Sequence, residues 1–396
     1  MLRGMSDRGP GYRGPGQPPA RSRHRLPWLF AAVGGAGAVI AALSSPADAR
    51  SASAQAWSPF VLVSGLLLIG LVADDDGLFA SAGHRLARTS RNGLALFLGA
   101  SVLIGVTTAL LNLDTSVAFL TPVLVYTARS RSESEAPLLC ASVLLANAGS
   151  LFLPGSNLTN LIVLGHLRIT GAAFFAHMWL PALTALVVTA AVIALSHRRA
   201  LRVTAEAREP AVSPVVGLGL VAVVVATALV VALRSPALPV LGVGIVVITA
   251  RLAQRREQPR RVIDTLGVPV LVGLFGLAVA LGTLGRTWSG PATLLNHLDT
   301  WGTATFAALS SVVVNNLPAA SLLAARRPSH PFSLLIGLNL GPNLFVTGSL
   351  AWILWLRAAR GVGAEPSIRS ASRIGLVAVP VALAAAVGVL VLSGAS

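Results

Sequence analysis

The amino-acid sequence predicts an all-α, polytopic membrane protein, and its composition and apolar runs lead to this fold class. Of the 396 residues, 54% are hydrophobic and 11% are charged, whereas a soluble domain carries about a quarter charged residues. Apolar runs of about 18 residues or more recur along the chain, and this is the length of a membrane-spanning helix. The alternation over about 10 residues that marks a transmembrane β-barrel is absent.

The formal net charge of +16 does not indicate a nucleic-acid-binding protein. The arginines stand in short clusters between apolar runs and are not interleaved with aromatic residues. The positive-inside rule places such clusters in the cytoplasmic loops of membrane proteins. We therefore expect a lipid bilayer, and no nucleic acid, around this chain.

Cysteine and histidine give no sign of a metal centre. The single cysteine, Cys140, excludes a disulfide framework and a multi-cysteine metal site, and we expect it to be a small buried side chain. His84, His166, His177 and His297 lie near span ends without the spacing of metal ligands. The sequence therefore predicts no metal and no cofactor.

Residues 1–26 are rich in arginine, glycine and proline, and they predict a disordered, basic cytoplasmic tail. The apolar segment 27–44 that follows predicts a first transmembrane helix. Ala47-Asp48-Ala49 comes next and resembles a signal-peptidase site, so cleavage after the apolar segment is the alternative. The topology of the remaining chain is the same in both cases.

The apolar segments set the number of spans that the sequence predicts. They lie near residues 27–44, 57–76, 93–129, 137–164, 172–196, 213–233, 236–252, 262–285, 301–325, 331–358 and 372–393. We assign the loops rich in arginine to the cytoplasm. The cytoplasmic loops are then 81–92, 129–135, 197–211 and 251–261, and the outer loops are 45–56, 165–171 and 286–300.

Two segments must then begin and end on the same side of the membrane. Segment 93–129 joins two basic loops and has the polar sequence LNLDTS at its middle. Segment 301–325 contains VVNNLP and is too short for two crossings of about 20 residues each. We expect two re-entrant hairpins and about nine full spans, with a cytoplasmic N-terminus and an extracytoplasmic C-terminus. Arg326 and Arg327 then lie outside, as exceptions to the positive-inside rule.

A short internal repeat follows the two hairpins. SLFLPGS at 150–156 and NLFVTGS at 343–349 share Leu-Phe and Gly-Ser in register. Each stands inside a long apolar segment, 137–164 or 331–358, and the two segments have opposite predicted orientations. Two halves of inverted topology, each with a broken helix, are a common architecture of secondary transporters.

The repeat also sets the domain boundaries that we expect. These are the first two spans 27–76, repeat 1 at 93–196, a cytoplasmic linker 197–212, further spans at 213–261, and repeat 2 at 262–396. The hairpin and the broken helix form the first part of repeat 1 and the middle of repeat 2. The sequence therefore predicts an inverted-repeat ion-transporter fold.

Pro154 and Gly155 explain the break in the first of these helices. Proline removes a backbone donor and glycine relaxes the chain, so the helix can unwind there. An unwound segment at membrane depth must be buried in protein or line an aqueous cavity. The N-terminal end of the half-helix that follows favours an anionic or polarised oxygen.

The polar residues around the breaks and the hairpin tips carry no formal charge, and we expect them to bind a small, oxygen-rich solute. In the first repeat these residues are Asn112, Ser150, Ser156, Asn157, Thr159 and Asn160. In the second repeat they are Asn315, Asn316, Asn339, Gly341, Pro342, Asn343, Thr347, Gly348 and Ser349. The alternative is that small polar residues only hold neighbouring helices together.

Asp114 is the one carboxylate predicted near the middle of the membrane, at the tip of the first hairpin. An acid in the membrane is costly to bury and is a functional hypothesis by default. We expect Asp114 to exchange a proton or a cation during transport; the alternative is that it caps the following half-helix. Asp74-Asp75-Asp76 and Asp264 stand at span ends, where we expect solvated side chains.

Four stretches of the sequence resemble a known family. LNLDTSVAFLTPVLV, ANAGSLFLPGSNLTNLIV, SSVVVNNLPAASLL and GLNLGPNLFVTGSLAWILWL are similar to the arsenical pump (ArsB-type) permeases of the ion transporter superfamily. That superfamily also contains sodium–proton antiporters and sodium-coupled dicarboxylate carriers. The resemblance covers about 93–196 and 262–393. It implies an inverted-repeat carrier, often dimeric, whose hairpin tips and broken helices meet at one site and move like an elevator.

The resemblance also implies site residues by motif. These are Asn112, Asp114, Thr115, Ser156, Asn157, Asn315, Asn316, Asn343, Gly348 and Ser349. Asn112-Leu113-Asp114 stands where arsenite carriers often have an Asn-Asp pair, and Asn339 stands where an acid often precedes LGP. These two departures leave the coupling ion and the solute open.

We expect a secondary active transporter of the plasma membrane that exports arsenite or antimonite in exchange for protons. The alternative is a carrier of the same fold for another solute, either by sodium–proton antiport or by transport of a small inorganic or organic anion. A membrane-embedded enzyme is a remote alternative, because a second Asp-rich motif, His-Glu-x-x-His and a phosphate-binding loop are absent. A homodimer and a partner ATPase stay open.

Overall fold

The computed structural model describes residues 25–165, 167, 169–202, 217–255 and 257–394. These residues form helices joined by turns and contain no strand, which confirms the predicted all-α fold class. Residues 1–24 of the predicted tail 1–26 and most of the predicted linker 197–212 lie outside the described residues, and α1 begins within the predicted tail, at Arg25.

Six helical stretches within the described residues are long and apolar enough to cross a membrane. They are Pro27–Ser44, Pro46–Asp75, Gly93–Leu110, Gly171–Ser196, Pro259–Thr287 and Ile368–Leu392. Shorter apolar helices accompany them at Ala136–Gly149, Leu218–Ala232, Ala237–Ala253 and Thr300–Val314. The chain is therefore a polytopic membrane protein, and its number of full spans stays a prediction.

The helices follow the same order in two halves of the chain. The first half contains α1 (Arg25–Ser44), α2 (Pro46–Asp75), α3 (Leu78–Thr89), α4 (Gly93–Leu110), α5 (Leu113–Ser130), α6 (Ala136–Gly149), η1 (Pro154–Ser156), α7 (Leu158–Leu164), α8 (Gly171–Ser196) and η2 (Ala200–Arg202). α9 (Leu218–Ala232) leads to the second half. That half contains α10 (Ala237–Ala253), α11 (Pro259–Leu266), α12 (Val268–Thr287), α13 (Gly290–His297), α14 (Thr300–Val314), α15 (Asn316–Leu323), α16 (Pro331–Leu340), η3 (Gly341–Asn343), α17 (Ala351–Gly361) and α18 (Ile368–Leu392).

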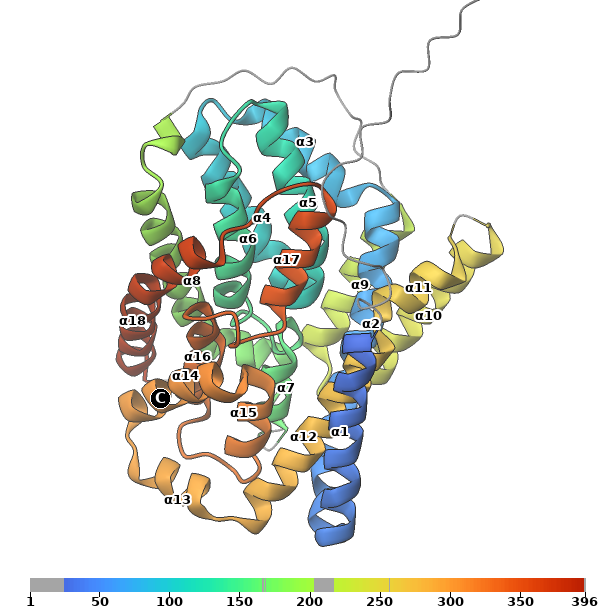
Figure 1. Ribbon diagram of the computed structural model, residues 1–396, viewed down its shortest axis with the longest axis vertical. Helices are drawn as coiled ribbons and strands as arrows, with labels where there is room; N and C mark the ends of the chain where they lie inside the picture. The colour runs from blue at the N-terminus through green and yellow to red at the C-terminus, as the bar shows by residue number, and fades with distance from the viewer. Residues whose placement is uncertain (1–24, 166, 168, 203–216, 256, 395–396) are drawn as a thin grey trace, which may run out of the picture.

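The two helical hairpins enter the molecule from opposite ends (Figure 1). α4 and α5 occupy the upper half of the view, and α14 and α15 occupy the lower half. α6 and α7 are the two parts of the first broken helix, and α16 and α17 are the two parts of the second. α8 and α18, the last helices of the two halves, pack against each other. This arrangement is an inverted repeat.

The outer helices extend the repeat in two reciprocal pairs. α1 packs along α12, and α10 packs along α2. Glycines bring the backbones together in both pairs. A Cβ on Gly34 would lie 2.1 Å from the carbonyl oxygen of Gly273, and a Cβ on Gly244 would lie 2.8 Å from that of Gly65. Each half thus contributes one helix to the surface of the other, by the small-residue contacts common between membrane helices.

Three segments that we predicted as loops contain helix. Most of segment 81–92 belongs to α3, part of 286–300 forms α13, and 45–56 belongs to the long helix α2. Pro46 occupies the first turn of α2, a favourable position for proline, and the Ser45 hydroxyl donates a hydrogen bond of 2.7 Å to Asp48. These segments are too polar or too short for an apolar-run analysis to detect.

Candidate functional site

Asparagine side chains cap the helices that follow both hairpin tips. The Oδ1 atom of Asn112 accepts a hydrogen bond of 2.7 Å from the backbone N–H of Thr115, and Oδ1 of Asn315 accepts one of 3.4 Å from Leu317. Asn315 has a φ of 78°, a left-handed conformation that asparagine tolerates better than most residues. The tips therefore turn sharply, and their caps satisfy backbone donors inside the membrane.

Each hairpin is fastened to the broken helix of its own half. The Ser156 hydroxyl donates to the carbonyl of Ala109 at 3.1 Å, and the Thr347 hydroxyl donates to that of Val312 at 2.9 Å. Both carbonyls precede their tip asparagine by three residues. The two bonds therefore reach equivalent positions of the hairpins, although their donors are not in register, since Ser156 matches Ser349 and Thr347 matches Pro154.

The second tip has further contacts with its broken helix. The backbone N–H of Asn316 donates to the carbonyl of Gly348 at 2.8 Å. The side-chain Nδ2 of Asn315 donates to the carbonyl of Thr347 at 3.1 Å. These bonds satisfy polar backbone groups that the unwound chain would otherwise leave unpaired.

The first broken helix unwinds after α6. Leu153 is extended, Pro154–Ser156 form a single 3₁₀ turn, and Asn157 caps α7 by accepting from the N–H of Thr159 at 3.1 Å. The side-chain Nδ2 of Asn160 donates to the carbonyl of Ser150 at 2.6 Å and to that of Leu153 at 3.2 Å. Asn160 therefore pairs the carbonyls that the break exposes.

Asn339 connects the broken helices of the two halves. Its Oδ1 atom accepts from Asn157 Nδ2 at 2.7 Å and lies 2.6 Å from the Ser150 hydroxyl. Its Nδ2 atom donates to Asn160 Oδ1 at 2.8 Å and to the carbonyl of Leu335 at 2.8 Å. Ser150, Asn160 and Asn339 are fully buried. The network is therefore closed around Asn339 and rigid.

A second contact between the broken helices mirrors the first. Asn147 Nδ2 donates to Asn343 Oδ1 at 2.9 Å, and Asn343 Nδ2 donates to the carbonyl of Leu144 at 2.9 Å. Asn147 and Ser150 of the first half thus meet Asn343 and Asn339 of the second half in reciprocal order. We did not predict Asn147. The repeat contains a signal for it. Ser150 matches Asn343, and Asn147 precedes Ser150 by three residues, much as Asn339 precedes Asn343 by four.

A small pocket lies where the four half-helices begin. It is lined by Leu113 and Asp114 of α5, Asn157 and Leu158 at the start of α7, Asn315, Asn316 and Leu317 at the start of α15, Ser349, Leu350 and Ala351 at the start of α17, and Leu274 of α12. Helix N-termini carry partial positive charge, so this pocket favours an electron-rich oxygen. Within the described chain, no arginine or histidine lines it.

Asp114 brings the only carboxylate to this pocket. It forms no hydrogen bond or ion pair with any described residue. Three nearby members of the predicted set also have buried side-chain atoms without a partner: Asn112 Nδ2, Thr115 Oγ1 and Ser349 Oγ. Buried polar atoms are almost always paired, by protein or by water. These unpaired atoms therefore favour a site that takes water, an ion or a solute.

The structure divides the predicted site residues into three groups. Asp114, Asn157, Asn315, Asn316 and Ser349 line the pocket. Ser150, Asn160, Asn339 and Asn343 join Asn157 in the buried network behind it. Asn112, Thr115, Ser156, Thr347 and Gly348 shape or fasten the hairpins and the breaks. Leu274 and Asn147 were outside the prediction, and of these two Leu274 reaches the pocket.

The acidic end of α2 differs from the expectation of solvated side chains. Asp76 and Arg251 form an ion pair whose side chains are only 6% and 8% exposed, and Asp76 also accepts from the N–H of Gly219 at 2.7 Å. Asp74 and Asp75 pair with Arg261. This end of α2 therefore binds α10 and α11, because the chain brings arginines back to it. Asp264 is 73% exposed, as expected.

The fold and the pocket define a membrane transporter, and comparison with known proteins places the chain in a family. The citrate transporter family (CitMHS) matches residues 22–356, so the chain belongs to that family.

Named relatives and a solved structure agree with the transporter class. An arsenical pump membrane protein of Yersinia enterocolitica is 25% identical over 336 residues, covering 76% of this chain and 78% of that protein. The protein of the same name in Escherichia coli (strain K12) is 24% identical and covers 82% of this chain and 84% of its own length. The crystal structure of the Alcanivorax borkumensis YdaH transporter matches with a TM-score of 0.52 and 15% identity, covering 87% and 86% of the two chains. The expected resemblance to arsenical pump permeases is thereby confirmed.

Proposed function

We propose that this membrane transporter exports arsenite or antimonite across the plasma membrane in exchange for protons. The observation that carries the proposal is the position of Asp114, a single unpaired carboxylate in a pocket of otherwise neutral side chains. A carboxyl group in this position can bind a proton on one side of the membrane and release it on the other. The names of the relatives, at 24–25% identity, favour an arsenical solute.

The neutral part of the pocket suits a small solute with several hydroxyl groups. Asn157, Asn315 and Asn316 offer amide donors and acceptors, and Ser349 offers a hydroxyl whose oxygen has no partner among the described residues. Arsenous acid in its uncharged form presents hydroxyl groups and no formal charge. Oxygen and amide contacts of this kind bind reversibly, which a carrier needs because it must release its load.

Transport of a small anion is the second candidate function, and one observation favours it. The N-terminal ends of α5, α7, α15 and α17 meet at the pocket, and their partial positive charges favour an anion. The family name points in the same direction. In this case Asp114 would have to be protonated or paired with a cation whenever the anion is bound.

Arsenite uptake by everted membrane vesicles tests both candidates. Everted vesicles expose the cytoplasmic side, so an exporter accumulates its solute. Under the proposal, wild-type vesicles accumulate arsenite, collapse of the proton gradient stops uptake, and Asp114→Asn does not accumulate it. Asp264→Asn, which changes an exposed carboxylate, is the control and keeps wild-type uptake.

The same vesicles separate the remaining alternatives. Uptake that requires ATP after the proton gradient is removed would indicate a partner ATPase. Vesicles that contain intact protein but accumulate citrate or phosphate instead of arsenite would favour the anion carrier. Proton release that depends on added sodium, without solute uptake, would favour sodium–proton antiport.

The proposal includes a cytoplasmic N-terminus and an extracytoplasmic C-terminus. α3 and the end of α8 lie near the top of Figure 1. α3 contains Arg85 and Arg88 and is followed by Arg91, and α8 is followed by Arg198, Arg199 and Arg202. The positive-inside rule assigns this end to the cytoplasm. A cysteine at exposed Ser393 in a Cys140→Ala background should react with an impermeant maleimide in intact cells. A cysteine at Arg91 should react only after permeabilisation; the reverse pattern would invert the topology.

A further inference from the structure

α3 is a short amphipathic helix between α2 and the first hairpin. Phe79, Gly83 and Ala87 form its buried face, and Phe79 stacks on Phe119 of α5 with ring centroids 5.6 Å apart. Arg85 and Arg88 are exposed on the rest of its surface. Such a helix, apolar on one face and basic on the other, is typical of the membrane interface.

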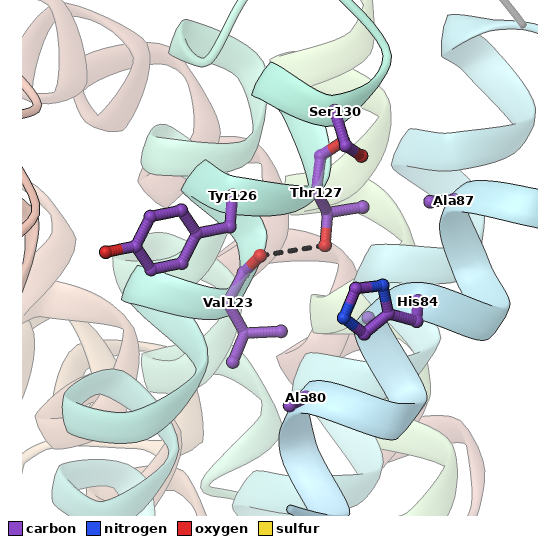
Figure 2. Close-up of a pocket in the computed structure, with 8 residues that line it drawn as sticks. Ala80, His84, Ala87, Val123, Tyr126, Thr127 and Ser130 are labelled. Carbon is purple, nitrogen blue, oxygen red and sulfur yellow. Dashed lines mark hydrogen bonds between the residues drawn. The ribbon is translucent and has the colours of Figure 1, made fainter. Parts of the chain in front are cut away.

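A groove runs between α3 and α5, and small side chains produce it. A Cβ on Gly83 would lie 2.5 Å from Cγ1 of Val123, so the two helices touch at this glycine. On either side of the contact, Ala80 and Ala87 are too small to fill the space between the helices. The resulting groove is lined by Ala80, Gly83, His84, Ala87, Val123, Tyr126, Thr127 and Ser130; Figure 2 shows His84 on α3 opposite Thr127 on α5.

The polar side of the groove contains hydrogen-bond acceptors. The Thr127 hydroxyl donates to the carbonyl of Val123 at 2.7 Å, and the Ser130 hydroxyl donates to that of Thr127 at 3.0 Å. Each hydroxyl uses its one proton in these bonds and keeps lone pairs for an external donor. The groove therefore combines an apolar wall with hydroxyl groups near one end.

Cations stand beside the hydroxyl end of the groove. Arg88 lies one helical turn beyond His84, and Arg91 follows the end of α3; both are exposed. Arg85 is also exposed, but it lies two residues after Gly83 and so faces away from the groove. None of these three arginines forms an ion pair with a described residue. Arg131 has a different role: it donates to the carbonyl of Ala87 at 2.6 Å and pairs with Glu133, so it fixes the end of α3 against the α5–α6 turn. The cluster of exposed arginines is complementary to an anionic group.

We propose that this groove binds a phospholipid with an anionic headgroup. The acyl chain lies along Ala80, Ala87 and Val123, the phosphate meets Arg88 and Arg91, and headgroup hydroxyls donate to Thr127 and Ser130. A basic segment beside a membrane helix attracts anionic lipids, and the groove gives one such lipid a defined position. The inference does not depend on which solute the protein carries.

Native mass spectrometry of the purified full-length protein tests the proposal. The protein is extracted in detergent and mixed with phosphatidylglycerol or with phosphatidylcholine of the same acyl composition. Wild type should retain phosphatidylglycerol in preference to phosphatidylcholine. Arg88→Gln with Arg91→Gln should lower the affinity for phosphatidylglycerol by about 10-fold or more, since each arginine near an anionic surface changes binding about fivefold.

A second variant separates the groove from general surface charge. Ala80→Phe fills the groove at an exposed position and leaves every arginine in place, so it should also weaken binding of phosphatidylglycerol. Arg198→Gln with Arg199→Gln removes two exposed arginines at the same end of the molecule, outside the groove, and should leave binding unchanged. Equal loss in this control pair, or wild-type binding by Ala80→Phe, would overturn the proposal. Solute transport by each variant in vesicles confirms that the protein is folded.

Discussion

The two broken helices follow one sequence pattern but differ in chemistry. The first half brings a carboxylate, Asp114, to the shared pocket, and its hairpin tip has unpaired polar atoms on Asn112 and Thr115. The second half brings only amides and a hydroxyl, and hydrogen bonds from Asn315 and Asn316 fasten its tip to residues 347–348. We therefore propose that the first half exchanges ions and that the second half holds the shape of the pocket.

This difference has a physical basis in an inverted repeat. Two copies of one structural unit give the same backbone positions twice, on opposite sides of the membrane. A carboxylate is costly to bury without a partner, and a second acid in the pocket would repel the first. Asn316 and its neighbours supply the second half with polar groups that carry no charge.

The largest expected effect concerns the acid that distinguishes the first half. Asp114→Asn keeps the size and shape of the side chain and its ability to form hydrogen bonds, but it removes the carboxyl group that can bind and release a proton. We expect proton-driven uptake in everted vesicles to fall to the background level, with normal amounts of folded protein. Asp264→Asn serves as the control, and normal gradient-driven transport by Asp114→Asn would remove the proposed distinction between the halves.

Asn339→Ala tests whether the second half holds the two breaks together. The change leaves Asn157 Nδ2 and Asn160 Oδ1 without their partner, so the free energy of unfolding should fall by about 2–4 kcal/mol. Asn343→Ala should cost less, about 1–2 kcal/mol, because Asn147 Nδ2 also contacts the carbonyl of Val143 at 3.2 Å.

Denaturant titration in mixed micelles measures both variants of the network. Asn296→Ala provides the control, since this exposed asparagine only accepts a bond from Ser329 and its loss should change stability by less than about 0.5 kcal/mol. Equal effects of Asn339→Ala and Asn343→Ala would mean that the two contacts between the halves are equivalent in energy as well as in position.

Glycines at the same register of the two breaks give a matched pair. A Cβ on Gly348 would lie 2.4 Å from Cα of Pro342, whereas a Cβ on Gly155 would meet Val230 at an ordinary 3.4 Å. Gly348→Ala should therefore destabilise the protein by about 1–3 kcal/mol, and Gly155→Ala should change stability by less than about 1 kcal/mol. Thermal unfolding of the two purified variants measures the loss of stability in each. A larger loss for Gly155→Ala would show that the backbone is packed more closely at the first break than at the second.

The hydroxyls that fasten the hairpins give the smallest expected difference. Ser156 is fully buried and also accepts from the N–H of Leu153 at 3.2 Å, so Ser156→Ala should cost about 1–2 kcal/mol. Thr347 is exposed, and Thr347→Val should stay within about 0.5 kcal/mol of wild type. The same unfolding measurement compares them, and a larger cost at Thr347 would contradict the burial argument.

Local sequence signals located the breaks and the hairpins. Pro154-Gly155 and Gly341-Pro342 each stand inside a long apolar segment and indicate that its helix is broken there. Asparagine stands at both hairpin tips. The structure has unwound chain after α6 and after η3, and it has hairpin turns before α5 and α15. Such features depend on a few neighbouring residues, so the sequence contains the information.

Other features were not predictable from local signals. α3 and α13 are short and do not form apolar runs, so a search for apolar runs passes over them, although α3 has an amphipathic period with Phe79, Gly83 and Ala87 on one face. The ion pair between Asp76 and Arg251 joins residues far apart in the chain, and apolar Leu274 gives no sign that it reaches a polar pocket. Their roles follow from packing between distant helices.

The sequence by itself determined that this protein is a helical membrane transporter with two broken helices. Hydrophobic runs, proline, glycine and asparagine affect the conformation of the residues next to them, so their effects can be predicted from the local sequence. The tertiary structure decided how the two halves meet. It paired Asn147 with Asn343 and Asn339 with Ser150, and it brought four helix N-termini to one pocket around Asp114. Such contacts depend on the crossing of helices that lie far apart in sequence, where the close approach of small residues fixes the geometry.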